Sequence, residues 1–356
     1  MKEYIQLLQK LIQTQSFSKE EEPAAHLIRR VLTEKGISFQ AKKNNTWAKN
    51  ANWKDGLPVI LLNSHVDTVR PAKNWTKDPF GAELDGDDLY GLGSNDAGAS
   101  LVTLLAVFIH FNQKNDLPFN LIYAASAEEE ISGPDGMASL IGELGPVDLA
   151  IVGEPTQMQM AIAEKGLMVL DCTAHGKAGH AARNEGENAL YKALDDIQKL
   201  RDYRFEKTSE VLGEVKLSVT QIHAGSQHNV VPDQCTFVVD VRTNEHYSNQ
   251  QAFEIIAGLI GSDVKARSFR LNSSGIELTH PIVKRGLELG LTYYGSPTTS
   301  DQAVMPFQSI KIGPGDSARS HTADEYIRLS EIEAGFKTYV ALLDGLILKA
   351  SEFGHA

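Results

Sequence analysis

The stretch VILLNSHVD, residues 59–67, joins an unbroken apolar run to a histidine and an aspartate. An apolar run that does not alternate with polar residues is typical of a strand buried on both faces of an α/β sheet. Three more such runs follow, at residues 121–125, 149–152 and 310–312. Residues 97–111, rich in alanine and leucine, predict a helix between the first two runs. The sequence therefore predicts an α/β domain with a mainly parallel sheet.

Side chains that bind metals or move protons follow all four runs. In open α/β sheets, ligands bind outside the carboxyl ends of the strands, so we expect these side chains to face one crevice. One further carboxylate belongs to a glycine-rich turn. In chain order the residues are His65, Asp67, Asp96 within GLGSNDAG (91–98), Glu129 and Glu130 within SAEEE (126–130), Glu154, and His321 within GPGDSARSHTADE (313–325).

These donors are imidazoles and carboxylates without a thiolate, which suits divalent cations, and zinc is the usual choice for hydrolysis. Carboxylates crowded together repel one another unless cations neutralise them. On an extended segment His65 and Asp67 point the same way, so Asp67 can fix the surroundings of a metal-binding His65. Taken singly, each signal also fits a structural histidine or a solvated charge run. Together, at four strand ends, they favour a metal site.

The middle of the chain has a different pattern, in which strands and helices follow the order β-α-β-β-α-β of a ferredoxin-like domain. We therefore predict a discontinuous α/β domain, residues 1–166 and 273–356, with an inserted α+β domain at 167–272. The six predicted elements are strand 167–174, helix 188–203, strands 215–222 and 236–241, helix 250–260 and strand 264–271.

Composition excludes several classes of protein. The 356 residues include 34 Lys and Arg against 46 Asp and Glu, a net charge of −12, which argues against a nucleic-acid partner. The sequence contains no apolar run of about 18 residues, so we expect no membrane span. The amphipathic N-terminus lacks the uninterrupted apolar core of a signal peptide. Cys172 and Cys235 are too few for a disulfide framework and are expected to be buried thiols. We therefore expect a cytoplasmic protein.

With these residues in view, the chain resembles the dinuclear zinc family that includes acetylornithine deacetylase, succinyl-diaminopimelate desuccinylase, aminoacylase and glutamate carboxypeptidases. The similarity runs nearly end to end and is closest to the acetylornithine deacetylase branch. It rests on the motifs NSHVDTV (63–69), YGLGSNDAGAS (90–100), SAEEEISG (126–133), VGEPT (152–156), HGKAGHAA (175–182), NVVP (229–232), VDVRT (239–243) and SHTADEY (320–326).

The resemblance implies a role for each residue of the crevice. His65 and Glu154 would hold one Zn²⁺ and Glu130 and His321 the other, with Asp96 bridging both. Cobalt or manganese remains possible in place of zinc. The resemblance further implies that Asp67 orients His65 and that Glu129 is the general base.

The resemblance also implies that the discontinuous domain is the zinc-binding catalytic domain and that the inserted domain is a lid and dimerisation domain. The inserted domain would contribute three more residues. The resemblance implies that His180 reaches the active site of a partner subunit and stabilises the oxyanion, which requires a homodimer. Arg242 and Asn229 would bind the substrate carboxylate and nearby groups. The chain departs from the family pattern where Leu92, Ala97 and Gly98 replace the usual Arg, Met and Lys, so its substrate preference stays open.

The implied function is removal of an N-acyl group, acetyl or succinyl, from a small amino acid, as acetylornithine deacetylase does in arginine biosynthesis. The alternative is a di- or aminopeptidase of the same fold. A metal-free binding or regulatory protein should have lost a ligand or the base, and none is missing. A nicotinamide-dependent oxidoreductase is excluded, because Asp96 stands where the dinucleotide fingerprint needs its third glycine.

Overall fold

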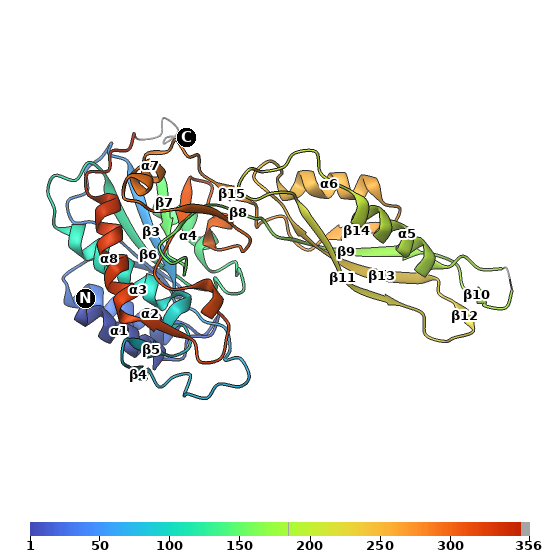
Figure 1. The fold of residues 1–356 in the computed structure, drawn as a ribbon, viewed down its shortest axis with the longest axis horizontal. Helices are drawn as coiled ribbons and strands as arrows, with labels where there is room; N and C mark the ends of the chain where they lie inside the picture. Colours follow the sequence, from blue (N-terminus) through green and yellow to red (C-terminus); the bar gives the residue numbers. More distant parts are fainter. Residues whose placement is uncertain (184, 350–356) are drawn as a thin grey trace. The chain divides into compact units, whose positions relative to one another are not determined.

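The chain folds into two compact units in the computed structural model, which describes residues 1–183 and 185–349. The main unit comprises residues 1–162, 276–294 and 300–349. The inserted unit comprises residues 163–275 and 295–299. The main unit contains the sheet and helices drawn in blue, cyan and red in Figure 1, and the inserted unit contains those in light green and yellow.

Four neighbouring parallel strands form the centre of the main sheet. They follow the spatial order β6 (Asn120–Ser126), β3 (Val59–His65), β7 (Leu149–Val152) and β17 (Ser309–Lys311). These are the four apolar runs of the sequence, and every residue of all four strands is buried. The prediction of a mainly parallel central sheet is therefore confirmed, and the carboxyl ends of these strands lie along one edge.

Further strands flank this parallel centre. On one side lie β2 (Asn45–Lys49) and β1 (Gln40–Lys42), which continue the sheet with antiparallel pairing. On the other side, β8 (Met160–Glu164) pairs antiparallel with β17 and with β15 (Ser274–Gly275), and it also pairs with β16 (Tyr293–Ser296). A separate small sheet follows the order β18 (Tyr326–Arg328), β5 (Asp88–Tyr90) and β4 (Leu84–Asp85). It joins the segment after His321 to the segment before Asp96.

Helices cover both faces of the main sheet, which explains the unbroken apolar runs. Helix α3 (Ala99–Asn112) contacts β3 and β6, and also packs against α1 (Lys2–Ile12) and α8 (Leu329–Leu343). Helix α4 (Met137–Leu144) shares a core cluster with Val59 and Leu61 of β3. The remaining helices of this unit are α2 (Glu22–Glu34) and α7 (Pro281–Glu288).

One apolar segment is longer than the sequence analysis expected. Ser94–Asn112 is long and apolar enough to cross a membrane by length and composition, but 83% of its 18-residue window is buried inside the protein. Contact with the sheet accounts for its apolar character. The α-helix itself begins at Ala99, two residues later than predicted, because Asp96 and Ala97 have non-helical backbone angles.

The inserted unit is a four-stranded antiparallel sheet covered by two helices. Its chain order is β9 (Met168–His175), α5 (Ala189–Asp202), β11 (Lys216–Ala224), β13 (Gln234–Arg242), α6 (Asn249–Leu259) and β14 (Asp263–Ala266). Short strands β10 (Gly179–His180) and β12 (Val230–Val231) pair with each other. The predicted β-α-β-β-α-β order is confirmed, with spatial strand order β11-β13-β9-β14.

The core of the inserted unit lies between its sheet and its helices. Cys172 and Cys235 belong to this core and are buried free thiols, as expected. The last predicted strand, residues 264–271, is shorter than expected. It ends at Ala266, and the polar residues that follow form a loop with a single bridge from Leu271 to Leu167.

Candidate metal centre and active site

The carboxyl ends of the four parallel strands bring the predicted metal-binding side chains together. His65 is the last residue of β3, and its imidazole is buried. Its Nε2 atom has no hydrogen-bond partner among the residues that the structure describes. Instead, carboxylate oxygens surround this atom: Asp96 Oδ1 lies 3.5 Å away, Glu154 Oε1 3.7 Å and Glu129 Oε2 4.0 Å.

Asp96 lies between the two imidazoles. Its Oδ1 is 3.5 Å from His65 Nε2, and its Oδ2 is 3.5 Å from His321 Nε2. His321 also lies 3.0 Å from Glu130 Oε2 through the same nitrogen. Glu154 thus lies near His65 and Glu130 lies near His321, and each carboxylate oxygen of Asp96 lies 3.5 Å from one of the two imidazoles.

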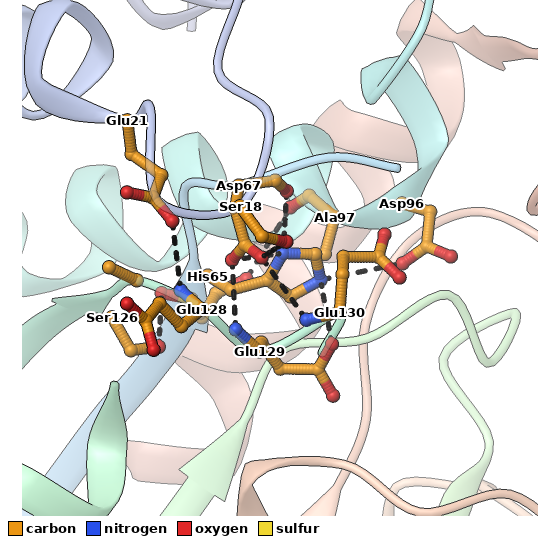
Figure 2. A network of polar contacts seen from close by, with 12 residues as sticks. Ser18, Glu21, His65, Asp67, Asp96, Ala97, Ser126, Glu128, Glu129 and Glu130 are labelled. Atoms are coloured by element: carbon orange, nitrogen blue, oxygen red, sulfur yellow. Dashed lines mark hydrogen bonds and ion pairs between the residues drawn. The ribbon is translucent and has the colours of Figure 1, made fainter. Parts of the chain in front are cut away.

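Asp67 contacts both His65 and the segment that carries Glu129 and Glu130 (Figure 2). His65 Nδ1 lies 2.9 Å from the Asp67 backbone oxygen and 3.6 Å from its carboxylate. The two carboxylate oxygens accept the backbone N–H groups of Glu129 and Glu130, and Ser18 donates its hydroxyl at 2.7 Å. The backbone carbonyl of Asp67 is therefore the nearer partner of His65, while its carboxylate mainly holds the glutamate loop.

Burial and mutual repulsion disturb the protonation of the cluster. Burial first, and then the neighbouring Asp96, raises the pKa of Glu154 to about 8. The pKa of Glu129 is also raised well above its usual value, by burial and then by nearby carboxylates that include Glu154. The hydrogen bond with Glu130 raises the pKa of His321 to about 9. Glu129 and Glu154 are thus unfavourable as anions unless positive charge is placed near them.

The residues present fit a pair of divalent cations. Two groups of donor atoms, each within 4.8 Å of one another, could hold an ion: His65, Asp96 and Glu130, and His65, Glu129 and Glu154. Among the described residues, the buried Nε2 of His65 has no hydrogen-bond partner, as expected of a nitrogen that binds a metal ion. Imidazole nitrogen and carboxylate oxygen are the donor types that hydrolytic zinc sites use.

Glu325 was missed by the sequence analysis, although it lies within the quoted motif SHTADEY. Its carboxylate is buried and accepts the backbone N–H groups of Gly93 at 3.2 Å, Asn95 at 2.9 Å and Asp96 at 3.0 Å. Burial, and then the charge of Asp96, raises the pKa of Glu325 to about 8. Glu325 therefore fixes the turn that presents Asp96, and it explains why this turn is not helical.

Asp301 is a second buried carboxylate that sequence reasoning did not single out. It accepts the Ser126 hydroxyl at 2.6 Å, at the end of β6. Burial is the main reason why the pKa of Asp301 rises to about 6. The sequence TTSDQ around it has no metal-ligand spacing, so only the folded chain shows its proximity to the cluster.

The three departures from the family pattern are accommodated by packing. Leu92 and Ala97 are buried. At Gly98 an added Cβ would lie 2.5 Å from the Gly93 backbone oxygen and 2.7 Å from Leu8 Cδ1. The usual lysine therefore has no room here unless its surroundings move.

The inserted unit carries the three remaining predicted site residues. His180 and Asn229 lie on neighbouring segments, where Ala181 N–H donates to the Asn229 carbonyl at 2.9 Å and strand β10 pairs with β12. Arg242 lies at the far end of β13, where its guanidinium binds Asp240 at 2.8 and 3.1 Å. His180 and Asn229 are exposed. Their catalytic and binding roles stay predictions.

A buried imidazole–carboxylate cluster at the carboxyl edge of a parallel α/β sheet defines a metal-dependent hydrolase. Comparison with known families specifies this class further. The sequence model described as Peptidase family M20/M25/M40 matches residues 61–345, and the chain belongs to this family.

Curated relatives and solved structures agree with this membership. Succinyl-diaminopimelate desuccinylase 2 of Ruegeria sp. (strain TM1040) is 27% identical over 273 residues, 71% of this chain and 68% of the relative. Succinyl-diaminopimelate desuccinylase of Cereibacter sphaeroides is 27% identical over 355 residues, 91% of this chain and 93% of that protein.

The similar solved structures include peptidases. A Bacillus cereus aminopeptidase superposes with a TM-score of 0.76 at 18% identity, covering 97% of this chain and 98% of the other. A Bacillus subtilis protein described as a dinuclear metal binding peptidase from the M20 family gives 0.72 at 18% identity, with the same coverage. At these identities the structures show a shared fold. The family model and the curated relatives identify the chain as a metallohydrolase of this family.

Proposed function

We propose that this protein is a two-metal amidohydrolase that removes an N-acyl group from an amino acid. The observation that carries the proposal is the position of Asp96, 3.5 Å from the Nε2 atoms of both His65 and His321. Single-metal sites have no need of a carboxylate shared between two imidazoles. When bound, a pair of Zn²⁺ ions, or Co²⁺ or Mn²⁺ in their place, would activate water and polarise the amide carbonyl.

The chain's own residues supply proton transfer and orientation. His65 and Glu154 would hold one ion, Glu130 and His321 the other, and Asp96 would face both. Glu129 takes a proton from the attacking water and returns it to the leaving amine, as a general acid–base. Asp67 orients His65 through its backbone oxygen and the loop of Glu129 through its carboxylate.

The acyl group that we propose first is succinyl. The curated relatives are named as desuccinylases, whereas acetylornithine and arginine biosynthesis rest on the sequence resemblance alone. The inserted unit offers a cationic surface for a second carboxylate. Lys216 lies directly opposite Arg242 in the β11–β13 pair, and Arg242 also forms an ion pair with Asp240. Burial, and then the charge of Lys216, lowers the pKa of Lys165 nearby.

We further propose a cytoplasmic homodimer formed through the inserted unit, in which His180 of each chain serves the partner's active site. Strand β11 is the outer strand of its sheet, and no described strand pairs with its outer edge. An unpaired edge is a ready surface for pairing with another chain. Analytical ultracentrifugation of the full chain tests this part: a monomer would rule out a role for His180 in trans.

A substrate panel tests the proposed reaction. The purified protein, loaded in turn with zinc, cobalt or manganese, would be given N-succinyl-diaminopimelate, N-succinylornithine, N-acetylornithine, N-acetylcitrulline and free dipeptides. We expect N-acyl amino acids to be hydrolysed with the highest kcat/KM. A preference for free dipeptides would favour the aminopeptidase alternative, which the fold of the solved relatives supports. Failure to cleave any of these amides would refute both.

A further inference from the structure

Four consecutive backbone N–H groups after β6 all donate to side-chain oxygens. Ala127 donates to Asn45 Oδ1 at 2.9 Å. Glu128 donates to Glu21 Oε1 at 3.2 Å, and Glu129 and Glu130 donate to the two oxygens of Asp67 at 3.0 and 3.1 Å (Figure 2). Side chains from three distant segments thus hold residues 127–130, which we call the glutamate loop.

The glutamate loop depends on these contacts because regular structure does not hold it. It leaves the sheet at Ser126, and Glu128 has a positive φ of 54°. Behind the loop is a cavity of about 300 Å³, bordered by Glu128, Lys43 and Asp135 among others, so dense packing does not support that side. Buried backbone N–H groups need acceptors. Here the acceptors also fix the backbone positions from which the side chains of Glu129 and Glu130 project.

Glu21 is the acceptor that lies farthest along the chain from the glutamate loop. Its side chain is fully buried and immediately precedes α2, where an acidic residue would ordinarily cap the helix. Within the described chain, however, it makes no side-chain capping hydrogen bond. Its Oε1 accepts the Lys19 N–H at 2.6 Å besides that of Glu128, and Asn44 donates to its Oε2 at 2.7 Å. The carboxylate is therefore fixed in place and directed at the glutamate loop.

We propose that Glu21 is a positioning residue that sets the geometry of the acid–base group Glu129 and the metal ligand Glu130 by holding the Glu128 N–H. The inference rests on the proposed function for the roles of those two glutamates. Glu21 touches neither substrate nor metal ligand side chain, and it acts only through the backbone. The structural consequence, a loop held in one conformation, is independent of which amide the enzyme cleaves.

The test compares Glu21→Ala with Glu21→Gln, which keeps a carbonyl acceptor for the two N–H groups. The matched control is Glu22→Gln, at the exposed neighbouring position. Asn44→Ala is a second, milder variant that loosens Glu21 without replacing it, in case Glu21→Ala does not fold. The measurements are amide hydrogen exchange of residues 127–131 and kcat and KM on the best substrate of the panel.

For Glu21→Ala we expect exchange in the glutamate loop to accelerate about tenfold or more, since hydrogen bonds to a charged group are worth at least that factor. We expect kcat to fall about 10–100-fold, as for other outer-shell partners, with KM nearly unchanged. Glu21→Gln should recover most of both, and Glu22→Gln should match the wild type. The proposal would be overturned if a folded Glu21→Ala protein exchanged the amides of the glutamate loop at the wild-type rate. It would also be overturned if exchange became faster throughout the main unit while kcat stayed normal.

The exchange measurement separates this inference from the proposed function. If the wild-type protein cleaves no amide of the panel, the proposed function fails. Exchange in Glu21→Ala then still decides whether Glu21 holds the loop.

Discussion

The Asp67 carboxylate accepts the backbone N–H of Glu129 at 3.0 Å. Its second oxygen accepts the N–H of Glu130, while its backbone oxygen faces His65 Nδ1. One residue therefore couples the position of a metal-binding imidazole to that of the proposed acid–base group. This coupling follows from the parallel sheet, because β3 and β6 are neighbours and end at the same edge.

Asp67→Asn tests this coupling. The amide keeps the shape of the side chain but replaces one acceptor oxygen with a donor that would face an N–H or hydroxyl donor. We expect kcat to fall about 10–100-fold, the usual cost of disturbing a residue behind the metal ligands. Steady-state kinetics measures this effect, with Ser18→Ala as a control that removes only the contact at 2.7 Å. A wild-type kcat in Asp67→Asn would show that the contacts are incidental.

Glu129→Gln and Glu130→Gln form a matched pair on adjacent residues. Glu129→Gln should keep both metals and lose about 10²–10⁴-fold in kcat, the contribution of a positioned acid–base group. Glu130→Gln should instead bind less metal, because Glu130 lies 3.0 Å from His321. Metal analysis of the purified variants, together with single-turnover rates, distinguishes the two. Loss of metal from Glu129→Gln with full residual activity would reverse the assignment.

Gly98→Lys restores the family pattern and should destabilise this protein. The added Cβ would meet the Gly93 backbone oxygen at 2.5 Å, which forces a shift near Asp96. We expect a loss of about 1–3 kcal/mol in the free energy of unfolding, typical of overpacking. Urea unfolding followed by tryptophan fluorescence reports on the main unit, which contains Trp47, Trp53 and Trp75. Gly142→Lys, where nothing lies within 4 Å of the added Cβ, is the control that should stay near wild type.

Asp196 makes the stability of the inserted unit depend on pH. Burial opposes its charge, but hydrogen bonds from the backbone of Gly261 and from Ser262 outweigh burial and lower the pKa of Asp196. A carboxyl group whose pKa is lower when folded stabilises the protein above its unfolded pKa of about 3.9. This stabilisation is lost as the pH falls through the folded pKa.

Asp196→Asn should therefore be less stable than wild type at neutral pH, by about 1–3 kcal/mol for a buried hydrogen-bonded carboxylate. The difference in the free energy of unfolding between the wild type and Asp196→Asn should narrow as the pH falls below about 4, because wild-type Asp196 then also loses its charge. Amide exchange in β9 and β13 measures the stability of this unit. The exposed Asp195→Asn is the control. A difference that grows on acidification would contradict the assigned direction.

Much of the fold could be predicted from local patterns. The continuous apolar runs indicated the four parallel strands, because strands covered on both faces tolerate no polar alternation. The crevice followed from a general rule about strand ends, which is how His65 and Glu154 were found. The predicted start of helix α3, at residue 97, was wrong by two residues, because the helix begins at Ala99. The Glu325 carboxylate binds the backbone N–H of Asp96 in the preceding turn, and the local sequence does not reveal this tertiary contact.

The residues that hold the glutamate loop could not be predicted from the sequence, because their contacts join segments that lie far apart along the chain. Glu21 and Asn45 meet the glutamate loop across 107 and 82 residues of chain. Locally, Glu21 looks like an acidic residue at the start of a helix and Asn45 like a turn residue. Only folding reveals which backbone groups they satisfy.

The central claim is that two cations lie on either side of Asp96, and anomalous diffraction from metal-loaded crystals tests it most directly. The account predicts two peaks per chain at ligand distance, about 2.0–2.2 Å, from imidazole nitrogen and carboxylate oxygen. One peak should contact His65 and Glu154 and the other Glu130 and His321, with an Asp96 oxygen directed at each. A single peak, or peaks remote from these five side chains, would contradict it.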